Sequence, residues 1–244
     1  MSSFLHFAQH LLQEVCLGIM ALVYTTRLIW FFRFKLGQER QATTSRRNTD
    51  RGRGQRSSLL NVAMPWSMES SRRNPLFYAQ FVVFHLGVVA AITLSFVIPY
   101  APSLLHPTVV LGLQVVMGAA AVVGVMRLFR RATNIYMRAI SSPDDYFSVI
   151  LLTTWFVFAV LAVDASIARQ GEWASLGYFL LTAFFLLYVP FSKISHYLYY
   201  PITRAYIGRT LGHRGVFPLE RGPRPANTPE IRQFAPALAE AKKG

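Results

Sequence analysis

Cysteine is nearly absent from this chain of 244 residues, which contains only Cys16. A single thiol cannot form an internal disulfide, an iron–sulfur ligand set or a cysteine-based zinc site. The sequence also lacks a CxxCH motif, which excludes covalent attachment of a c-type haem, and it has no glycine-rich nucleotide-binding motif or catalytic triad pattern. Iron–sulfur clusters, covalently attached haem, nucleotide binding and triad catalysis would have to be supplied by another protein.

Charge is also scarce, and negative charge most of all. Charged residues make up 15% of the chain and hydrophobic residues 53%, whereas an average soluble domain has about 25% and 45–50%. No acidic residue lies deep in an apolar run, which argues against a small transporter. The net charge of +14 leaves three explanations, namely a nucleic-acid partner, an anionic membrane surface or cytoplasmic loops.

Five apolar runs account for most of the hydrophobic residues. A helix needs about 20 apolar residues to cross the bilayer core, because no unpaired backbone group can face lipid. The runs occupy residues 12–34, 76–98, 108–128, 146–168 and 174–200. We therefore predict an all-α membrane protein whose five transmembrane helices form a bundle.

The basic residues separate by side of the membrane. Ten Lys and Arg fall within residues 33–73, four within 127–138 and nine within 193–243. The two remaining loops, 99–107 and 164–173, hold only Arg169. Because cytoplasmic loops are enriched in Lys and Arg, this pattern predicts the N-terminus outside and the C-terminus in the cytoplasm.

The same pattern divides the chain into three parts. We predict an outer N-terminal segment (1–11), a membrane domain (12–208) with a basic cytoplasmic loop (35–75), and a Pro-rich cytoplasmic tail (209–244). Within the loop, residues 41–58 are almost free of apolar side chains, so no stable structure is expected there. Its composition is like that of an RNA-binding tail, but beside a membrane helix we favour contact with anionic lipid or a partner subunit over nucleic acid.

Two of the six histidines lie at membrane depth. His85 is about nine residues, or roughly 13 Å, from the cytoplasmic start of the second run, and His196 is near the cytoplasmic end of the fifth. The two side chains could therefore face each other across the inner half of the bundle. The other four histidines lie outside the apolar cores and are interpreted as surface residues: His6, His10, His106 and His213.

This histidine pair has two interpretations, and spacing alone does not decide between them. Imidazoles from two helices are suitable axial ligands for the iron of a b-type haem. Alternatively, each imidazole forms a hydrogen bond to a neighbouring helix. In the haem interpretation Arg27, Lys193 and Arg204 are placed to pair with the propionates, although Lys193 and Arg204 are equally suited to reaching the membrane surface.

Three motifs resemble the nitrate reductase gamma-subunit family of membrane cytochromes b. Residues 189–196 read VPFSKISH and are followed by YLYYPITRAY, which is similar to the family's fifth-helix signature. Residues 84–87 read FHLG, and residues 129–147 read FRRATNIYMRAISSPDDYF; these are similar to the second-helix ligand motif and the loop into helix four. The resemblance covers residues 12 to about 208 and implies a five-helix fold with the N-terminus outside.

The resemblance also implies how many haems this chain binds and which haem ligands it lacks. Family members bind two b haems, but the second pair of ligand positions is occupied here by Ser95 and Tyr178. One haem b, ligated by His85 and His196 on the cytoplasmic side, is therefore expected. The family's quinol site lies near the missing outer haem, so Ser95, Tyr178 and His106 become candidates to bind quinone.

The function implied by the resemblance is electron transfer. We expect a haem b subunit, without substrate catalysis of its own, that passes electrons between membrane quinone and an iron–sulfur subunit on the cytoplasmic face of a prokaryotic plasma membrane. Relatives serve nitrate reductases, sulfite-reductase-associated and heterodisulfide-reductase-like complexes, and some hydrogenases. The alternative is a haem-free anchor that tethers a partner complex to the membrane.

Overall fold

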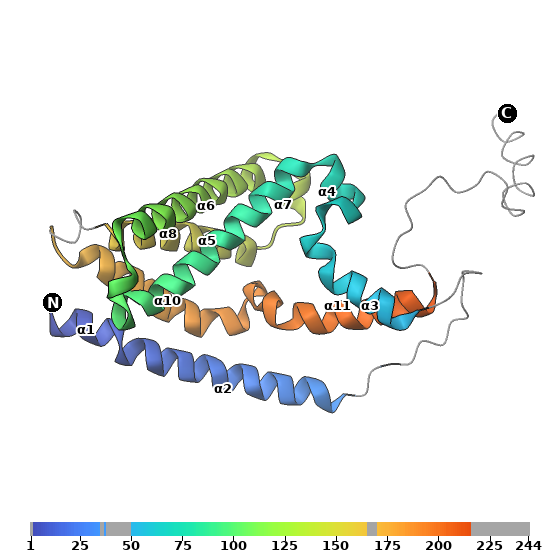
Figure 1. Cartoon of the computed structure of the whole chain (residues 1–244), viewed down its shortest axis with the longest axis horizontal. Helices are drawn as coiled ribbons and strands as arrows, with labels where there is room; N and C mark the ends of the chain where they lie inside the picture. The colour runs from blue at the N-terminus through green and yellow to red at the C-terminus, as the bar shows by residue number, and fades with distance from the viewer. Residues whose placement is uncertain (1, 35–36, 38–49, 165–169, 216–244) are drawn as a thin grey trace, which may run out of the picture. The chain divides into compact units, whose positions relative to one another are not determined.

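The computed structural model describes residues 2–34, 37, 50–164 and 170–215. Helices and turns, with no strand, make up these described residues (Figure 1). Five helical segments are long and apolar enough to cross a membrane: Ser3–Arg33, Pro75–Tyr100, Pro107–Thr133, Pro143–Ala162 and Trp173–Phe191. The prediction of an all-α, multi-pass membrane protein with lipid-facing helices is confirmed, while the direction in which the helices cross stays a prediction.

The chain divides into two compact units. The first comprises Met1–Gln38 and Ala63–Thr203, and the second Glu39–Val62 and Arg204–Gly244. The long helices of the first unit are α2 (Leu11–Arg33), α5 (Pro75–Tyr100), α6 (Pro107–Thr133), α8 (Pro143–Ala162) and α10 (Trp173–Tyr188). Its short helices are α1 (Ser3–Gln9), α4 (Glu69–Arg73) and α7 (Ile135–Ala139). Helix α3 (Arg51–Leu60) lies in the second unit, and α11 (His196–His213) begins in the first and ends in the second.

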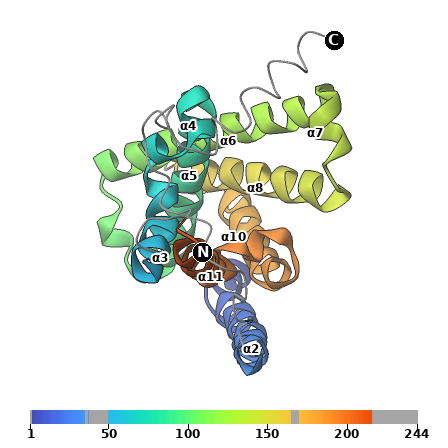
Figure 2. The ribbon, with the colours of Figure 1, turned by 90° about the vertical axis from the view of Figure 1, so that its right-hand side faces the viewer.

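Small residues allow three of the long helices to pack closely. Helix α5 packs on α6, and α6 packs on α8, as Figures 1 and 2 show. A Cβ atom at Gly87 would lie 2.2 Å from Cβ of Ala120, and one at Gly124 would lie 2.2 Å from Oγ1 of Thr153. Close backbone approach at small residues is a common source of stability between membrane helices, where the hydrophobic effect is absent.

The fourth span begins and ends earlier than the predicted 146–168. Pro143 occupies the first turn of α8, and Ser142 with Asp145 forms a capping box, so the backbone N–H groups of this turn are satisfied from Ser142 onward. Helix α8 ends at Ala162. Residues 165–169, in the last part of the predicted span, lie outside the described residues.

Within the predicted outer segment 1–11, residues Ser3–Gln9 form helix α1, which belongs to the first span. The Ser2 hydroxyl accepts a hydrogen bond from the Leu5 amide and caps α1. His10 leaves helical geometry with φ −113° and ψ −87°, which separates α1 from α2. The Ser2 hydroxyl also donates to Glu172 Oε2, and the Ser2 backbone N donates to Oε1 at 2.7 Å. These bonds to the residue before α10, the hydroxyl bond most of all, lower the pKa of Glu172.

The fifth span differs most from its prediction, because α10 ends at Tyr188 rather than continuing to residue 200. Pro190 lacks a backbone N–H and clashes with a continuing helix. Two 3-10 turns follow, η4 (Val189–Phe191) and η5 (Lys193–Ser195), and α11 then starts at His196. The Ser192 hydroxyl accepts from the Ile194 amide at 3.1 Å, which caps the turn that leads into α11.

Part of residues 41–58, where the sequence analysis expected no stable structure, is helical in the second unit. Residues 51–58 belong to α3, whereas most of the remainder, 41–49, lies outside the described residues. Asp50 caps α3 by accepting from the Arg53 amide at 2.9 Å, and this bond lowers the pKa of Asp50. The predicted tail, 209–244, is helical as far as His213, and residues 216–244 are not among those described.

Glycines explain how such a polar helix can pack. A Cβ atom at Gly54 would lie 2.4 Å from the Gly208 carbonyl oxygen and 2.6 Å from Cα of Gly212. Because these neighbours are backbone atoms of α11, they cannot move aside as a flexible side chain would. Arg204 adds a hydrogen bond from Nε to the Ser58 carbonyl at 3.3 Å. Close approach of the two backbones therefore packs α3 against α11, since residues 51–58 offer almost no apolar side chains for such packing.

Two alanine substitutions in α3 test this packing. Gly54→Ala should separate α3 from α11 at a cost of about 1–3 kcal/mol, and hydrogen exchange of the α3 amides should speed up by about tenfold or more. Gly52→Ala is the matched control, because a Cβ atom there meets only Oδ1 of Asp50 at 3.4 Å and Ala favours helix over Gly by about 1 kcal/mol. Equal exchange in both variants would contradict the close-packing explanation.

Candidate functional site

The structure brings together the two histidines that the sequence placed at membrane depth. His85 projects from the middle of α5, and His196 is the first residue of α11. Their ring centroids lie 6.3 Å apart, with the ring planes at 81° to each other. His85 is half-buried and His196 is exposed, so protein atoms do not enclose either imidazole.

Backbone hydrogen bonds fix the orientation of both rings. Nδ1 of His85 lies 2.7 Å from the Phe81 carbonyl oxygen, and Nδ1 of His196 lies 3.1 Å from that of Lys193. A carbonyl oxygen can only accept, so Nδ1 carries the proton in each ring. The lone pair of each neutral imidazole is then on Nε2, which is the arrangement that second-shell partners impose on metal-binding histidines.

The spacing of the two rings suits one metal ion held between them. A histidine nitrogen binds a transition metal at about 2.0 Å, and the centre of a five-membered ring lies about 1.1 Å from its atoms, so two opposed ligands place their ring centroids roughly 6 Å apart. The observed separation is 6.3 Å. Within the described residues no group of three or more His, Cys, Asp and Glu could hold a metal ion. A two-histidine site suits an ion that brings its other ligands with it.

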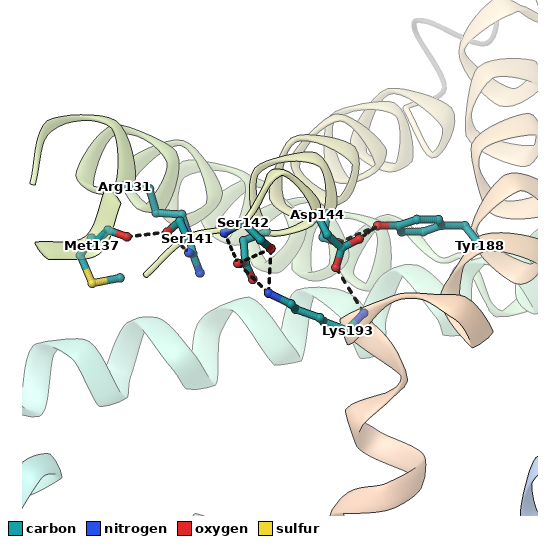
Figure 3. A network of polar contacts seen from close by, with 9 residues as sticks. Arg131, Met137, Ser141, Ser142, Asp144, Tyr188 and Lys193 are labelled. Carbon is teal, nitrogen blue, oxygen red and sulfur yellow. Dashed lines mark hydrogen bonds and ion pairs between the residues drawn. The ribbon is translucent and has the colours of Figure 1, made fainter. Parts of the chain in front are cut away.

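A network of polar contacts holds the segment that precedes His196 (Figure 3). We call this network the clamp; it consists of Ser142, Asp144, Asp145, Tyr188 and Lys193. The Lys193 ammonium donates to Asp145 Oδ2 and to the Ser142 hydroxyl, each at 2.8 Å. Asp144 accepts from the Tyr188 hydroxyl and, at 3.4 Å, from the Lys193 backbone N. Since the Lys193 carbonyl orients His196, the clamp connects α8 to the histidine ring.

The three propionate candidates occupy different surroundings. The Lys193 ammonium is engaged by the clamp. Arg27 donates from Nη1 to the Pro190 carbonyl, and its guanidinium stacks over the Phe191 ring at 5.1 Å; it therefore satisfies an acceptor at the helix break. Arg204 belongs to the second unit, where it donates to Ser58. Each cation thus has a structural partner within the chain.

Ser95 and Tyr178, the positions that the resemblance assigns to a second haem, lie in a region of packed side chains. Tyr178 has no exposed surface, and its hydroxyl donates to the Ala91 carbonyl at 2.5 Å. Its ring stacks on Trp155, with centroids 6.1 Å apart, and Trp155 in turn donates to the Thr182 hydroxyl at 2.9 Å. The polar groups of this region are therefore paired with one another inside an aromatic core.

The three quinone candidates are consequently not equivalent. Tyr178 is closed off in this core. Ser95 lies beside Tyr178 and donates to the Ile92 carbonyl at 2.7 Å, and its side chain is half-buried. His106 precedes α6 and is exposed. Of the three, only His106 presents a fully accessible polar side chain.

Arg127 is a residue near the site whose position the sequence analysis did not use. It lies on α6, and its guanidinium carbon is 4.5 Å from the centroid of the Phe84 ring. Phe84 precedes His85, and the centroids of these two rings are 6.3 Å apart. An arginine inside the apolar run 108–128 was the available signal, but its place near the end of the run allowed it to be counted with the cytoplasmic charges.

Comparison with known proteins adds a distant relative. A protein of Nitratidesulfovibrio vulgaris (strain Hildenborough), whose description names no activity, is 24% identical over 156 residues, covering 62% of this chain and 68% of the relative. No family model and no solved structure match the chain. The resemblance to membrane cytochromes b therefore stays a prediction that depends on the motifs and on the histidine geometry.

Removing the carboxylate of the clamp tests its contribution. Asp145→Ala deletes the capping box of α8 and the partner of Lys193, so we expect a loss of about 1–2 kcal/mol, measured by unfolding in detergent, and faster hydrogen exchange at residues 192–197. The matched control is Glu69→Gln, which removes the exposed Glu69–Arg73 pair and should cost less than about 0.5 kcal/mol. An effect of Asp145→Ala no larger than that of the control would refute this role.

Proposed function

We propose that the chain binds one haem b between His85 and His196. The observation that carries the proposal is the pair of neighbouring imidazoles, each with Nδ1 bonded to a backbone carbonyl and with ring centroids 6.3 Å apart. A structural histidine that only connects helices would donate to the neighbouring helix. Here each ring bonds to the carbonyl three or four residues earlier in its own segment, which leaves Nε2 for another ligand.

One haem rather than two is supported by the packing of the outer half. Tyr178 and Phe179 are fully buried there, with ring centroids 5.0 Å apart, and the Tyr178 ring stacks on Trp155. Ser95 and Tyr178 supply no imidazole, and the Tyr178 ring occupies core volume. A second macrocycle would have to displace this core, whereas the inner histidines are accessible.

We infer that the protein is the membrane electron-transfer subunit of a respiratory oxidoreductase in a prokaryotic plasma membrane. A bound haem would supply one-electron transfer between membrane quinone and an iron–sulfur partner on the cytoplasmic face. The role of the chain is to hold two neutral imidazoles at a fixed separation, through α5 on one side and the clamp on the other. The motif resemblance and the geometry of the histidine pair support this assignment.

The decisive experiment is an absorption spectrum of the purified full-length protein. We expect a reduced-minus-oxidised b-type signal with about one haem per chain, and complete loss of that signal in His85→Ala and in His196→Ala, because one imidazole cannot complete the axial pair. His10→Ala and His213→Ala are controls that should keep the haem. A haem-free wild-type protein would favour the anchor alternative, and about two haems per chain would contradict the single site.

The quinone assignment has a separate test. If the exposed His106 helps to bind quinone, His106→Ala should raise the quinone concentration needed for half-maximal haem reduction by about tenfold, the value of one hydrogen bond. Ser103→Ala, in the same loop, is the control. Unchanged quinone-linked reduction in His106→Ala would show that this histidine is an ordinary loop residue.

A further inference from the structure

Two arginines of α6 carry charge into the apolar part of the fold, and one of them, Arg127, lies near His85. Arg127 and Arg130 are three residues apart on α6, within the third membrane-spanning segment, Pro107–Thr133. Both are half-buried. Residues three apart on a helix share a face, so the two guanidinium groups project from α6 in a similar direction.

Both guanidinium groups contact aromatic rings of α5. Arg127 lies 4.5 Å from the ring centroid of Phe84, and Arg130 lies 4.5 Å from that of Phe77. Phe77 and Phe84 are two helical turns apart on α5, so the arginines bridge α6 to the cytoplasmic half of this helix. Stacking fixes the plane of a guanidinium group but uses none of its N–H donors.

No anion of the described residues neutralises these two arginines. Neither side chain has a hydrogen bond or ion pair within the described part of the chain. Their neighbour Arg131, by contrast, donates to the Ser141 hydroxyl at 2.6 Å. Desolvated charge at membrane depth is costly unless it is paired. An anionic ligand from outside the chain would supply the missing partner.

We propose that Arg127 and Arg130 bind the two carboxylates of the haem held by His85 and His196. This inference rests on the proposed haem function and adds the residues that recognise the ligand's acidic edge. Phe84 connects the two sites, because it contacts Arg127 and its ring lies 6.3 Å from that of His85. A planar guanidinium pairs with a carboxylate through two parallel hydrogen bonds.

This assignment differs from the expectation drawn from the sequence. Arg27 and Lys193 are already engaged by Pro190 and by the clamp, so neither has to recruit a ligand. Arg127 combines proximity to a histidine ligand with unused donors, and Arg130 adds further unused donors one turn along α6. The acidic edge of the haem would then face α6 rather than the turns before α11.

A ligand with blocked carboxylates separates this proposal from haem binding in general. The full-length protein, produced without haem, is titrated with haem and with haem dimethyl ester. Wild type should bind haem about 10- to 100-fold more tightly than the ester, the usual contribution of outer-shell partners to affinity. Arg127→Gln and the double variant with Arg130→Gln should lose most of this preference, while Arg127→Lys should keep part of it.

Arg138→Gln is the matched control, since it removes the same charge from an exposed position on α7. It should discriminate between haem and ester as wild type does. Helix content and elution volume of each variant show whether it is folded. The midpoint potential should also fall in Arg127→Gln but not in Arg138→Gln, because a nearby positive charge favours the reduced haem.

Three results would overturn the proposal in distinguishable ways. If wild type binds haem and its ester equally, or if Arg127→Gln keeps the preference, these arginines do not bind the carboxylates. If the double variant loses tightly bound anionic phospholipid instead, the partner is a lipid phosphate. If wild type binds neither ligand, the haem function itself is wrong.

Discussion

The break in the fifth span at Pro190 is the constraint on which the candidate site depends. Inside a membrane an interrupted helix is tolerated only where other groups satisfy the freed backbone. Arg27 donates to the Pro190 carbonyl, and the Ser192 hydroxyl accepts from the Ile194 amide. Tyr197 donates to the Tyr24 hydroxyl at 2.8 Å. These contacts, with the clamp, allow α11 to restart at His196 in a defined position.

The interruption has a direct consequence for the imidazole. In a continuous helix the carbonyls before His196 would accept from amides of the following turn. After the break, the Lys193 carbonyl accepts from the backbone N–H of His196 and also, at 3.1 Å, from Nδ1 of its ring. His85 achieves the same within α5 by bonding to Phe81, as histidines in helices can do without any interruption. The two imidazoles are therefore held by different backbone arrangements that engage the same ring nitrogen, Nδ1.

The parts of this fold that depend on hydropathy could be predicted from the sequence, and the parts that depend on contacts between distant segments could not. Five apolar runs predicted five spans, because lipid leaves the backbone few alternatives. The same runs predicted that His85 and His196 could face each other, and their ring centroids lie 6.3 Å apart. The order of residues 51–58 was missed because it depends on the approach of Gly54 to Gly208 and Gly212, which composition does not reveal. The restart at His196 depends on contacts to Arg27 and Asp145 from other helices.

The small number of acidic residues affects both the clamp and the two arginines of α6, Arg127 and Arg130. The chain has 11 acidic residues for 25 basic ones, and Asp144 and Asp145 are used to hold Lys193 and Tyr188. An acid placed on α5 opposite Arg127 would have neutralised that arginine within the fold, but it would also have brought a fixed negative charge close to His85. Because Arg127 and Arg130 stack on aromatic rings instead, their positive charge stays unneutralised by the fold. Arg127 keeps this charge near His85, whose Nε2 has no backbone partner. A ligand with both an iron centre and carboxylates would bind Nε2 and would also neutralise the arginines. A metal ion alone would bind Nε2 but would leave the arginines without an anion.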